Sequence, residues 1–267
     1  MFCFQCEQTV GCTGCTGNAG VCGKKADTAK LQDELTGALI SLANAVDGTE
    51  TISKRTGQII IEGLFTTVTN VSFDNAAIEN MIQKVRAEKE RLVPDCRTEE
   101  YDLQQLWNAN EDIRSLKSLI LFGIRGMAAY AYHANVLNYE DAEVNQFFCE
   151  ALSKIGYEES TEALLSTVLK TGEINLKCMA LLDKANTETY GTPEPTDVTL
   201  TVEKGPFIVV TGHDLKDLQL LLEQTEGKGI NIYTHGEMLP AHAYPFLKKY
   251  SHLKGNFGTA WQNQQKE

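Results

Sequence analysis

The first 22 residues of this 267-residue chain hold five of its eight cysteines, in a segment rich in glycine and threonine. Such a segment has too few apolar side chains to form a core. Cysteines clustered this closely bind a metal or form disulfides, depending on the redox compartment. The start of the chain has neither the basic nor the apolar stretch of a secretory signal, so we expect a cytoplasmic protein with reduced thiols. The cysteines therefore predict a metal centre near the N-terminus.

Four of these cysteines, Cys3, Cys6, Cys15 and Cys22, follow the spacing Cys-x2-Cys-x8-Cys-x6-Cys. An iron–sulfur cubane takes one thiolate at each iron, and a glycine-bearing loop allows the chain to wrap around it. Three alternatives stay open: one zinc ion on two close pairs that include Cys12, a disulfide framework, or free thiols clustered by chance. The spacing between the pairs is short for a zinc ribbon and leaves Cys22 unused.

Leucines near helical spacing begin after the cysteine segment, with Asp27 as the expected N-cap of the first helix. Further segments with the same period follow, and almost nothing before residue 190 has the period of a strand. We therefore expect an all-α bundle over residues 27–190, with the cysteine-rich loop 1–26 packed on it. The expected helices cover residues 28–46, 51–70, 75–92, 101–108, 112–134, 141–155, 161–171 and 174–185.

A polar run with two prolines, within the expected linker 191–204, separates this bundle from a segment with a different period. Short apolar runs at 206–211 and 229–234 flank an amphipathic helix at 214–224. They form a βαβ unit, which makes the two strands parallel. We therefore expect a multi-domain protein in which residues 205–267 begin an α/β domain. One such unit is too little sheet to stand alone, so we expect the chain to be truncated.

His213 and Glu237 follow the two expected strands directly, at their carboxyl ends. In parallel strands these ends lie side by side, in the crevice where α/β folds bind ligands. The pair suits a metal that takes one imidazole and one oxygen donor. Two alternatives stay open: a histidine that only precedes a helix capped by Asp214, and a zinc site that includes His235 and His242.

The net charge of −12 argues against a surface that follows a phosphate backbone, so we expect no nucleic-acid partner. No apolar run is long enough to cross a bilayer, so no membrane partner is expected either. The richest apolar stretch, residues 119–132, is interrupted by Arg125.

The N-terminal motifs resemble those of hybrid-cluster proteins, the prismane or hydroxylamine reductase family. They are residues 1–9 (MFCFQCEQT), 14–16 (GCT) and 20–24 (GVCGK). The resemblance implies a [4Fe–4S] cluster on the four spaced cysteines, because family members with a [2Fe–2S] cluster have longer spacing. Cys12 is extra to the family pattern and is expected to be a spectator thiol, although it could substitute for a neighbour.

Two later motifs, residues 211–218 (TGHDLKDL) and 233–242 (YTHGEMLPAH), resemble the same family in order and spacing. They imply that His213 and Glu237 bind the hybrid [4Fe–2O–2S] cluster of the full-length protein. The implied activity is reduction of hydroxylamine to ammonia and water, with the N-terminal cluster relaying electrons from a redox donor protein. Family members are also linked to nitric oxide reduction.

The remaining hybrid-cluster ligands of this family lie downstream of the end of this chain. Cys96, Cys149 and Cys178 cannot replace them, because they lie in or beside helical patterns where buried structural thiols are expected. One alternative is therefore a non-catalytic iron–sulfur electron-transfer or interaction fragment.

Two further alternatives concern other enzymes. A related nickel or iron carbon monoxide dehydrogenase shares the fold that the resemblance implies, but the N-terminal motif favours hybrid-cluster proteins. A zinc-dependent hydrolase would use His213, His235 and Glu237 as its ligands.

Overall fold

The computed structural model describes residues 2–6, 14–48, 51–69, 71–94, 100–263 and 266–267. The contacts divide the chain into two compact units. Unit 1 comprises Met1–Asn135 and Glu140–Leu181, and unit 2 comprises Val136–Tyr139 and Leu182–Glu267. One boundary between the units, Leu181/Leu182, therefore falls inside the helix Thr161–Tyr190.

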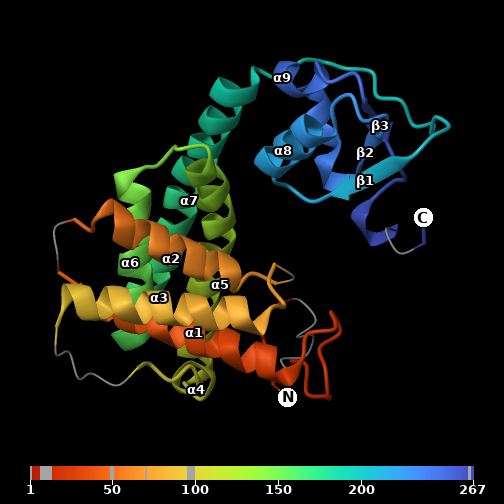
Figure 1. Cartoon of the computed structure of the whole chain (residues 1–267). Coiled ribbons are helices and arrows are strands. Elements are labelled where there is room, and N and C mark those ends of the chain that lie inside the picture. The colour runs from red at the N-terminus through yellow and green to blue at the C-terminus, as the bar shows by residue number, and fades with distance from the viewer. Residues whose placement is uncertain (1, 7–13, 49–50, 70, 95–99, 264–265) are drawn as a thin grey trace. The chain divides into compact units, whose positions relative to one another are not determined.

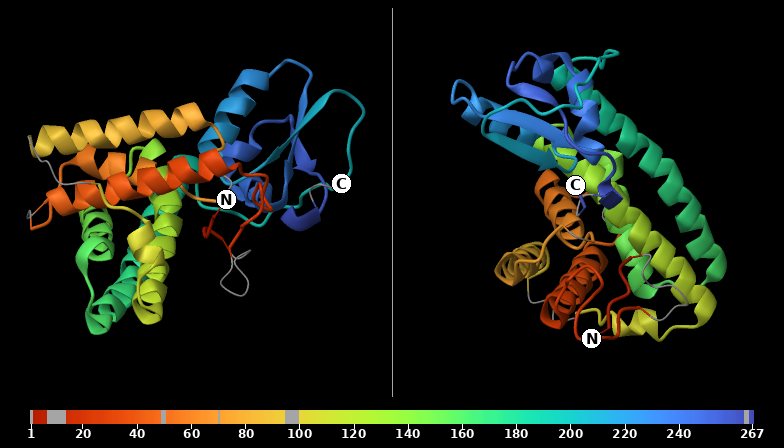
Figure 2. Two further views of the ribbon diagram at one scale, coloured as in Figure 1. Left: turned by 90° about the horizontal axis from the view of Figure 1, so that it is seen from below. Right: turned by 90° about the vertical axis from the view of Figure 1, so that its right-hand side faces the viewer.

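Unit 1 is helical, as the leucine spacing predicts. Its helices are α1 (Ala26–Ala45), α2 (Lys54–Thr66), α3 (Asn75–Leu92), α4 (Gln104–Trp107), α5 (Glu111–Val136), α6 (Ala142–Tyr157) and α7 (Thr161–Tyr190), of which α7 continues into unit 2. Figures 1 and 2 show α1, α2 and α3 side by side, with α5, α6 and the first part of α7 running crosswise to them. Helix α1 contacts both α3 and α6, and its Leu35, Leu39 and Leu42 are fully buried.

The start of the first helix differs from the sequence prediction. Helix α1 begins at Ala26 with Lys25 as the N-cap, so the prediction of Asp27 as the N-cap was wrong. Asp27 lies instead in the first turn, where its carboxylate accepts the backbone N–H of Thr28 at 2.9 Å. A carboxylate in the first turn still stabilises the helix, because it satisfies a backbone donor near the positive end of the helix dipole.

The two helices expected at 161–171 and 174–185 are one continuous helix, α7. The sequence prediction broke the pattern at Gly172, which lies in the helix interior. A single glycine weakens a helix by about 1 kcal/mol but does not remove a backbone hydrogen bond, so it does not end the helix. The expected helix 101–108 is shorter than predicted and forms only the four residues of α4.

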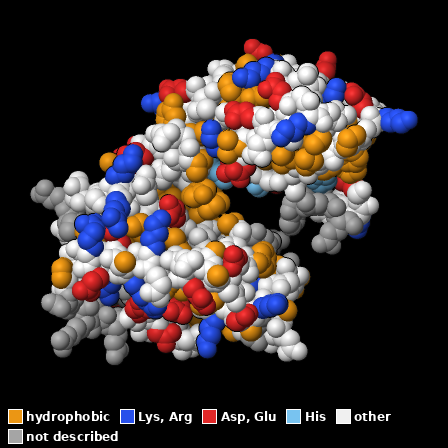
Figure 3. Space-filling model, viewed as in Figure 1, with side chains coloured by type: hydrophobic (Ala, Val, Ile, Leu, Met, Phe, Trp, Pro, Cys, Tyr) orange, Lys and Arg blue, Asp and Glu red, His pale blue; other side chains and the backbone are white. Residues whose placement is uncertain are grey.

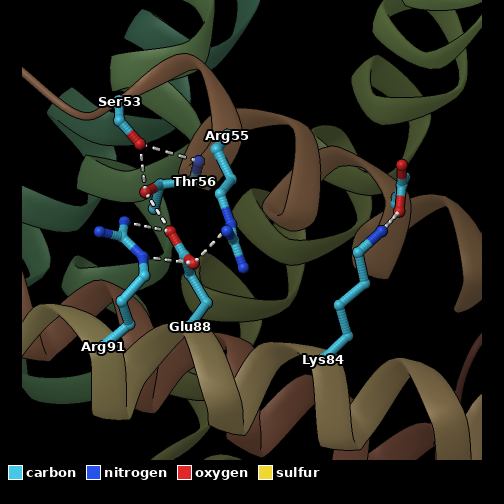
Figure 4. Close-up of polar contacts among 7 residues, drawn as sticks. Ser53, Arg55, Thr56, Lys84, Glu88 and Arg91 are labelled. Atoms are coloured by element: carbon cyan, nitrogen blue, oxygen red, sulfur yellow. Dashed lines mark hydrogen bonds and ion pairs between the residues drawn. The ribbon is translucent and has the colours of Figure 1, made fainter.

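Glu88 of α3 is a fully buried carboxylate that joins α3 to α2 (Figure 4). It accepts a hydrogen bond from Thr56 Oγ1 at 2.7 Å and forms ion pairs with Arg91 at 2.7 Å and with Arg55 at 3.1 Å. The hydrogen bonds from Arg91 and Thr56, together with the charges of Arg91 and Arg55, lower the pKa of Glu88 despite the opposing effect of burial. Glu88 is therefore ionised, and its carboxylate is bound by Thr56, Arg91 and Arg55.

Gly37 in α1 allows the backbone at Tyr101 to approach the helix closely. A Cβ atom at residue 37 would lie 2.2 Å from the carbonyl oxygen of Tyr101. We expect Gly37→Ala to lower the free energy of unfolding by about 1–3 kcal/mol, because the backbone would have to move apart. Gly172→Ala is the control, since nothing lies within 4 Å of its Cβ position. Urea unfolding of both variants measures the difference, and equal stability would contradict the steric argument.

Unit 2 contains a three-stranded parallel sheet with strand order β1–β2–β3. Its elements are β1 (Phe207–Thr211), α8 (Leu215–Thr225), β2 (Asn231–His235), η2 (Gly236–Ala243), α9 (Pro245–Lys248), β3 (Leu253–Asn256) and η3 (Trp261–Asn263). The expected βαβ unit is present as β1, α8 and β2. Strand β3 was not predicted, since its sequence Leu-Lys-Gly-Asn lacks a β-branched apolar run. Leu218 and Leu222 of α8 are buried in the core of this unit.

No helix in the described part of the chain is long and apolar enough to cross a membrane. On the face of unit 1 drawn in Figure 3, acidic and basic side chains are interspersed. The described residues on that face therefore form no extended basic surface.

Candidate functional site

The four predicted cysteines lie in the N-terminal loop of unit 1, which precedes helix α1. Cys3 and Cys15 pair as antiparallel strands do, with backbone N–H···O distances of 3.2 Å and 3.0 Å. Gly14 makes this pairing possible, because its φ is +63° and a Cβ atom there would lie 2.8 Å from the carbonyl oxygen of Cys3. The backbone thus fixes two of the four cysteines opposite one another.

A turn at residues 20–24 carries Cys22. The N–H of Gly20 donates to the carbonyl of Lys24 at 2.8 Å, and the N–H of Gly23 donates to the carbonyl of Gly20 at 2.9 Å. The loop is also tied to the bundle, since Thr69 Oγ1 donates to the carbonyl of Gln5 at 2.9 Å. Two isolated backbone bridges, a turn and this hydrogen bond to the bundle therefore help to hold the loop in place.

All four cysteines line one pocket, together with Gln5, Gly20, Val21, Lys24 and Thr69. Their thiols are free, with Cys22 exposed and the other three half-buried. The structure therefore brings together the four residues that the spacing selected. Cys12 lies outside the described residues, as does Cys96.

In the described part of the chain, the four thiols do not form a ready-made site for a single ion. Among the described residues, no three His, Cys, Asp or Glu side chains lie close enough together to bind one ion. A tetrahedral zinc needs all its ligands around one centre. The thiolates of a cubane each bind a different iron, so they are spread around a larger body.

Two buried cations lie beside these cysteines. Lys24 is 1% exposed, and its Nζ donates to Gln5 Oε1 at 2.6 Å and to Gln32 Oε1 at 2.5 Å. Arg125 of α5 is 5% exposed, donates from Nη2 to Thr36 Oγ1 at 2.8 Å, and has no partner for Nε among the described residues. A buried charge is costly unless it is paired, and Asp33 interacts electrostatically with both cations.

Burial shifts the pKa of three groups at or beside the site. Burial raises the pKa of the Cys3 thiol, while the charge of Lys24 acts in the opposite direction. Burial also raises the pKa of Asp33 to about 6, against the attraction of Arg125. The pKa of Arg125 is lowered to about 10 by burial, with Asp33 and Cys3 opposing that shift. Burial is the largest cause of each of these three shifts, and the neighbouring charges of opposite sign oppose it.

Sequence reasoning missed Lys24, Gln32, Asp33 and Arg125 as parts of the site. Two weak signals were present. Lys24 belongs to the motif around Cys22, and Arg125 interrupts the richest apolar stretch of the chain. A charged residue in such a stretch is costly to bury, so its presence indicates a buried polar function.

Cys149 and Cys178 are buried thiols in the helical bundle, as the sequence predicts. Burial raises the pKa of each to about 12. Each is close to a main-chain carbonyl of a neighbouring helix, at 3.8 Å from Ala43 and 3.5 Å from Met127. They are uncharged at neutral pH and pack as small apolar side chains.

In unit 2 the side chains of His213 and Glu237 meet, Nε2 of the imidazole contacting Oε2 of the carboxylate. They come from the carboxyl ends of β1 and β2, where Thr211 is paired with His235 across the parallel strands. The side chains are 67% and 56% exposed, so the pair is open to solvent. The expected convergence is observed, and the role of the two residues as cluster ligands stays a prediction.

The two neighbouring histidines have other partners. His242 is buried, contacts Thr234 Oγ1 at 2.9 Å through Nε2, and has a pKa lowered by burial. His235 is 3% exposed and contacts Glu267 at 3.0 Å. The helix α8 begins after Asp214, whose carboxylate accepts the N–H groups of Lys216 and Asp217. Asp214 is therefore the N-cap of α8, as expected from the sequence, and His213 directly precedes it.

The whole chain, residues 1–267, matches the Prismane/CO dehydrogenase family. The hydroxylamine reductase of Thermodesulfovibrio yellowstonii is 48% identical over 298 aligned residues, which cover 100% of this chain and 54% of that protein. The hydroxylamine reductase of Solidesulfovibrio magneticus is 45% identical over 297 aligned residues, with the same two shares. The chain thus spans about half the length of the curated relatives it matches.

Among solved structures, a nickel-free carbon monoxide dehydrogenase from Thermococcus sp. AM4 aligns with a TM-score of 0.31 and 15% identity. The alignment covers 91% of this chain and 41% of that chain. A TM-score this low supports no argument about the fold. The family match rests instead on the amino-acid sequence, which matches over residues 1–267, and this chain therefore belongs to the Prismane/CO dehydrogenase family.

Proposed function

We propose that this chain is the N-terminal part of a hybrid-cluster oxidoreductase that reduces hydroxylamine to ammonia and water. The observation that carries the proposal is the single pocket lined by Cys3, Cys6, Cys15 and Cys22 beside the buried Lys24. Relatives at 45–48% identity carry the name hydroxylamine reductase. Nitric oxide is a second candidate substrate for reduction at the same cluster.

In this proposal the four cysteines hold a [4Fe–4S] cluster, while His213 and Glu237 contribute two ligands to a hybrid [4Fe–2O–2S] cluster of the full-length protein. When bound, the two clusters would supply one-electron transfer from a redox donor protein and reduction of the N–O bond. The cysteines must be deprotonated to bind iron, and Lys24 favours the thiolate of Cys3. His213 and Glu237 offer one nitrogen and one oxygen donor at the edge of the sheet.

A second candidate function is a non-catalytic iron–sulfur fragment. His213 and Glu237 have no third His, Cys, Asp or Glu side chain within reach of the same ion in the described part of the chain. Two ligands do not hold a cluster of several irons. The chain as given would then bind the N-terminal cluster and transfer electrons without turning over hydroxylamine.

Metal analysis of the anaerobically purified chain tests the proposal. We expect about four irons and four acid-labile sulfides per chain, no zinc, and the broad visible absorption of a cubane. Hydroxylamine turnover by the full-length protein, followed with a reduced viologen dye, tests the reductase proposal, and turnover by this chain alone would exclude the second candidate. One zinc and no sulfide would overturn the iron–sulfur proposal for this chain.

A further inference from the structure

We propose that Lys24 is a fixed buried cation that raises the reduction potential of the cluster on the four N-terminal cysteines. The inference rests on the proposed function, because it requires a cluster in that pocket. In this inference Lys24 does not bind the cluster but acts on its reduction potential through its charge.

The geometry places the Lys24 ammonium in an uncharged cage. Its two hydrogen bonds go to the side-chain oxygens of Gln5 and Gln32, at 2.6 Å and 2.5 Å. Both partners are neutral amides, and Lys24 has no carboxylate partner among the described residues. Its side chain also lines the pocket that the four cysteines line. The positive charge is therefore held in place but is not neutralised by its hydrogen-bond partners.

The surrounding charges do not cancel it either. Asp33 is half-buried and interacts electrostatically with both Lys24 and Arg125. Asp102 also acts on Asp33, but it is exposed, so water and salt screen it. Two cations therefore face the half-buried Asp33, and a negatively charged cluster with its thiolates would complete the balance of charge.

A fixed positive charge favours the reduced cluster over the oxidised one. Reduction adds one negative charge to a body that is already negative, and Coulomb attraction to Lys24 grows with that charge. The effect is large where little water intervenes, and Lys24 is 1% exposed. Removing the charge should therefore make the cluster harder to reduce.

The test is a redox titration of the iron-loaded chain, with the reduced fraction followed by electron paramagnetic resonance. Lys24→Met and Lys24→Gln remove the charge, and Lys24→Arg keeps it. We expect the two neutral variants to show at least a tenfold lower ratio of reduced to oxidised cluster at a fixed potential, which is about 59 mV for one electron. Lys24→Gln still offers a hydrogen-bond donor, so it separates charge from hydrogen bonding.

Lys25→Gln is the matched control, because it removes the same charge from the adjacent, exposed lysine. We expect a change of about twofold or less there, since the charge is screened by water. Equal reduction potentials in the neutral variants and the wild type, with iron content unchanged, would overturn the inference about Lys24 but not the proposed function. Loss of iron from both neutral variants but not from Lys24→Arg would also overturn it, since the cation would then be needed for cluster binding. Absence of iron from the wild type would instead overturn the proposed function.

Discussion

Replacement of Cys22 by serine is expected to lower the iron and acid-labile sulfide of the purified chain from about four of each to fewer than one. A serine hydroxyl is a far weaker ligand for iron than a thiolate, and the cluster needs one thiolate at each iron. Cys22 is the most suitable of the four positions, because it is exposed and lies ten residues from Cys12. Substitution by a neighbouring cysteine is therefore least expected there.

The turn that carries Cys22 should survive the substitution. Its two hydrogen bonds join backbone atoms of Gly20, Gly23 and Lys24, and none involves the Cys22 side chain. The helical content by circular dichroism should then stay close to that of the wild type. Loss of iron without loss of helix would identify Cys22 as a ligand rather than as part of the fold.

Cys178→Ala is the matched control, because it removes a thiol that is buried in the helical bundle and uncharged at neutral pH. We expect this variant to keep its iron while losing about 1 kcal/mol or more of stability from the lost packing. A Cys22→Ser chain with a full complement of iron would contradict the assignment. It would indicate that another residue, such as Cys12, completes the cluster.

The sequence predicted those parts of the structure that depend on local pattern. The period of the leucines predicted the helices of unit 1, and two apolar runs around an amphipathic helix predicted β1, α8 and β2. The convergence of His213 and Glu237 followed from parallel strands alone, because topology brings their carboxyl ends together. Each of these predictions needed only the local sequence pattern or the rule that a βαβ crossover makes its two strands parallel.

The parts that were missed depend on contacts between distant segments. Lys24 from the loop binds Gln32 from α1, and Arg125 from α5 lines a pocket with Cys6. No local sequence pattern relates these positions. Strand β3 is similar, since its pairing with β2 supplies the order that its own four residues do not indicate. The continuity of α7 through Gly172 is decided by packing along the rest of the helix.

Glu88→Gln is expected to lower the free energy of unfolding at pH 7 by about 2 kcal/mol, the usual size of hydrogen bonds to a charged group. The substitution keeps the shape of the side chain but removes the charge that Arg91 and Arg55 bind. Both arginines are partly exposed, at 45% and 67%, so they can turn to solvent. This freedom keeps the loss below that of a fully buried ion pair.

Glu62→Gln is the matched control, because it removes the carboxylate of an exposed ion pair between the same two helices (Figure 4). Its partner Lys84 is 48% exposed and Glu62 is 39% exposed. We expect a loss of at most about 1 kcal/mol, since surface pairs contribute little. Urea unfolding measures both variants, and equal losses would contradict the role assigned to burial at Glu88.

The pH dependence gives a second test of the same carboxylate. The folded protein holds the pKa of Glu88 below its ordinary value, so the folded state favours the ionised form. The resulting stabilisation is present above the unfolded pKa of about 4.3 and is lost as the pH falls through the lower folded pKa. The stability difference between wild type and Glu88→Gln should therefore be constant from pH 7 to about 5 and shrink below about 4. A difference that persists unchanged at pH 3 would mean that shape, and not charge, is what Glu88 contributes between α2 and α3.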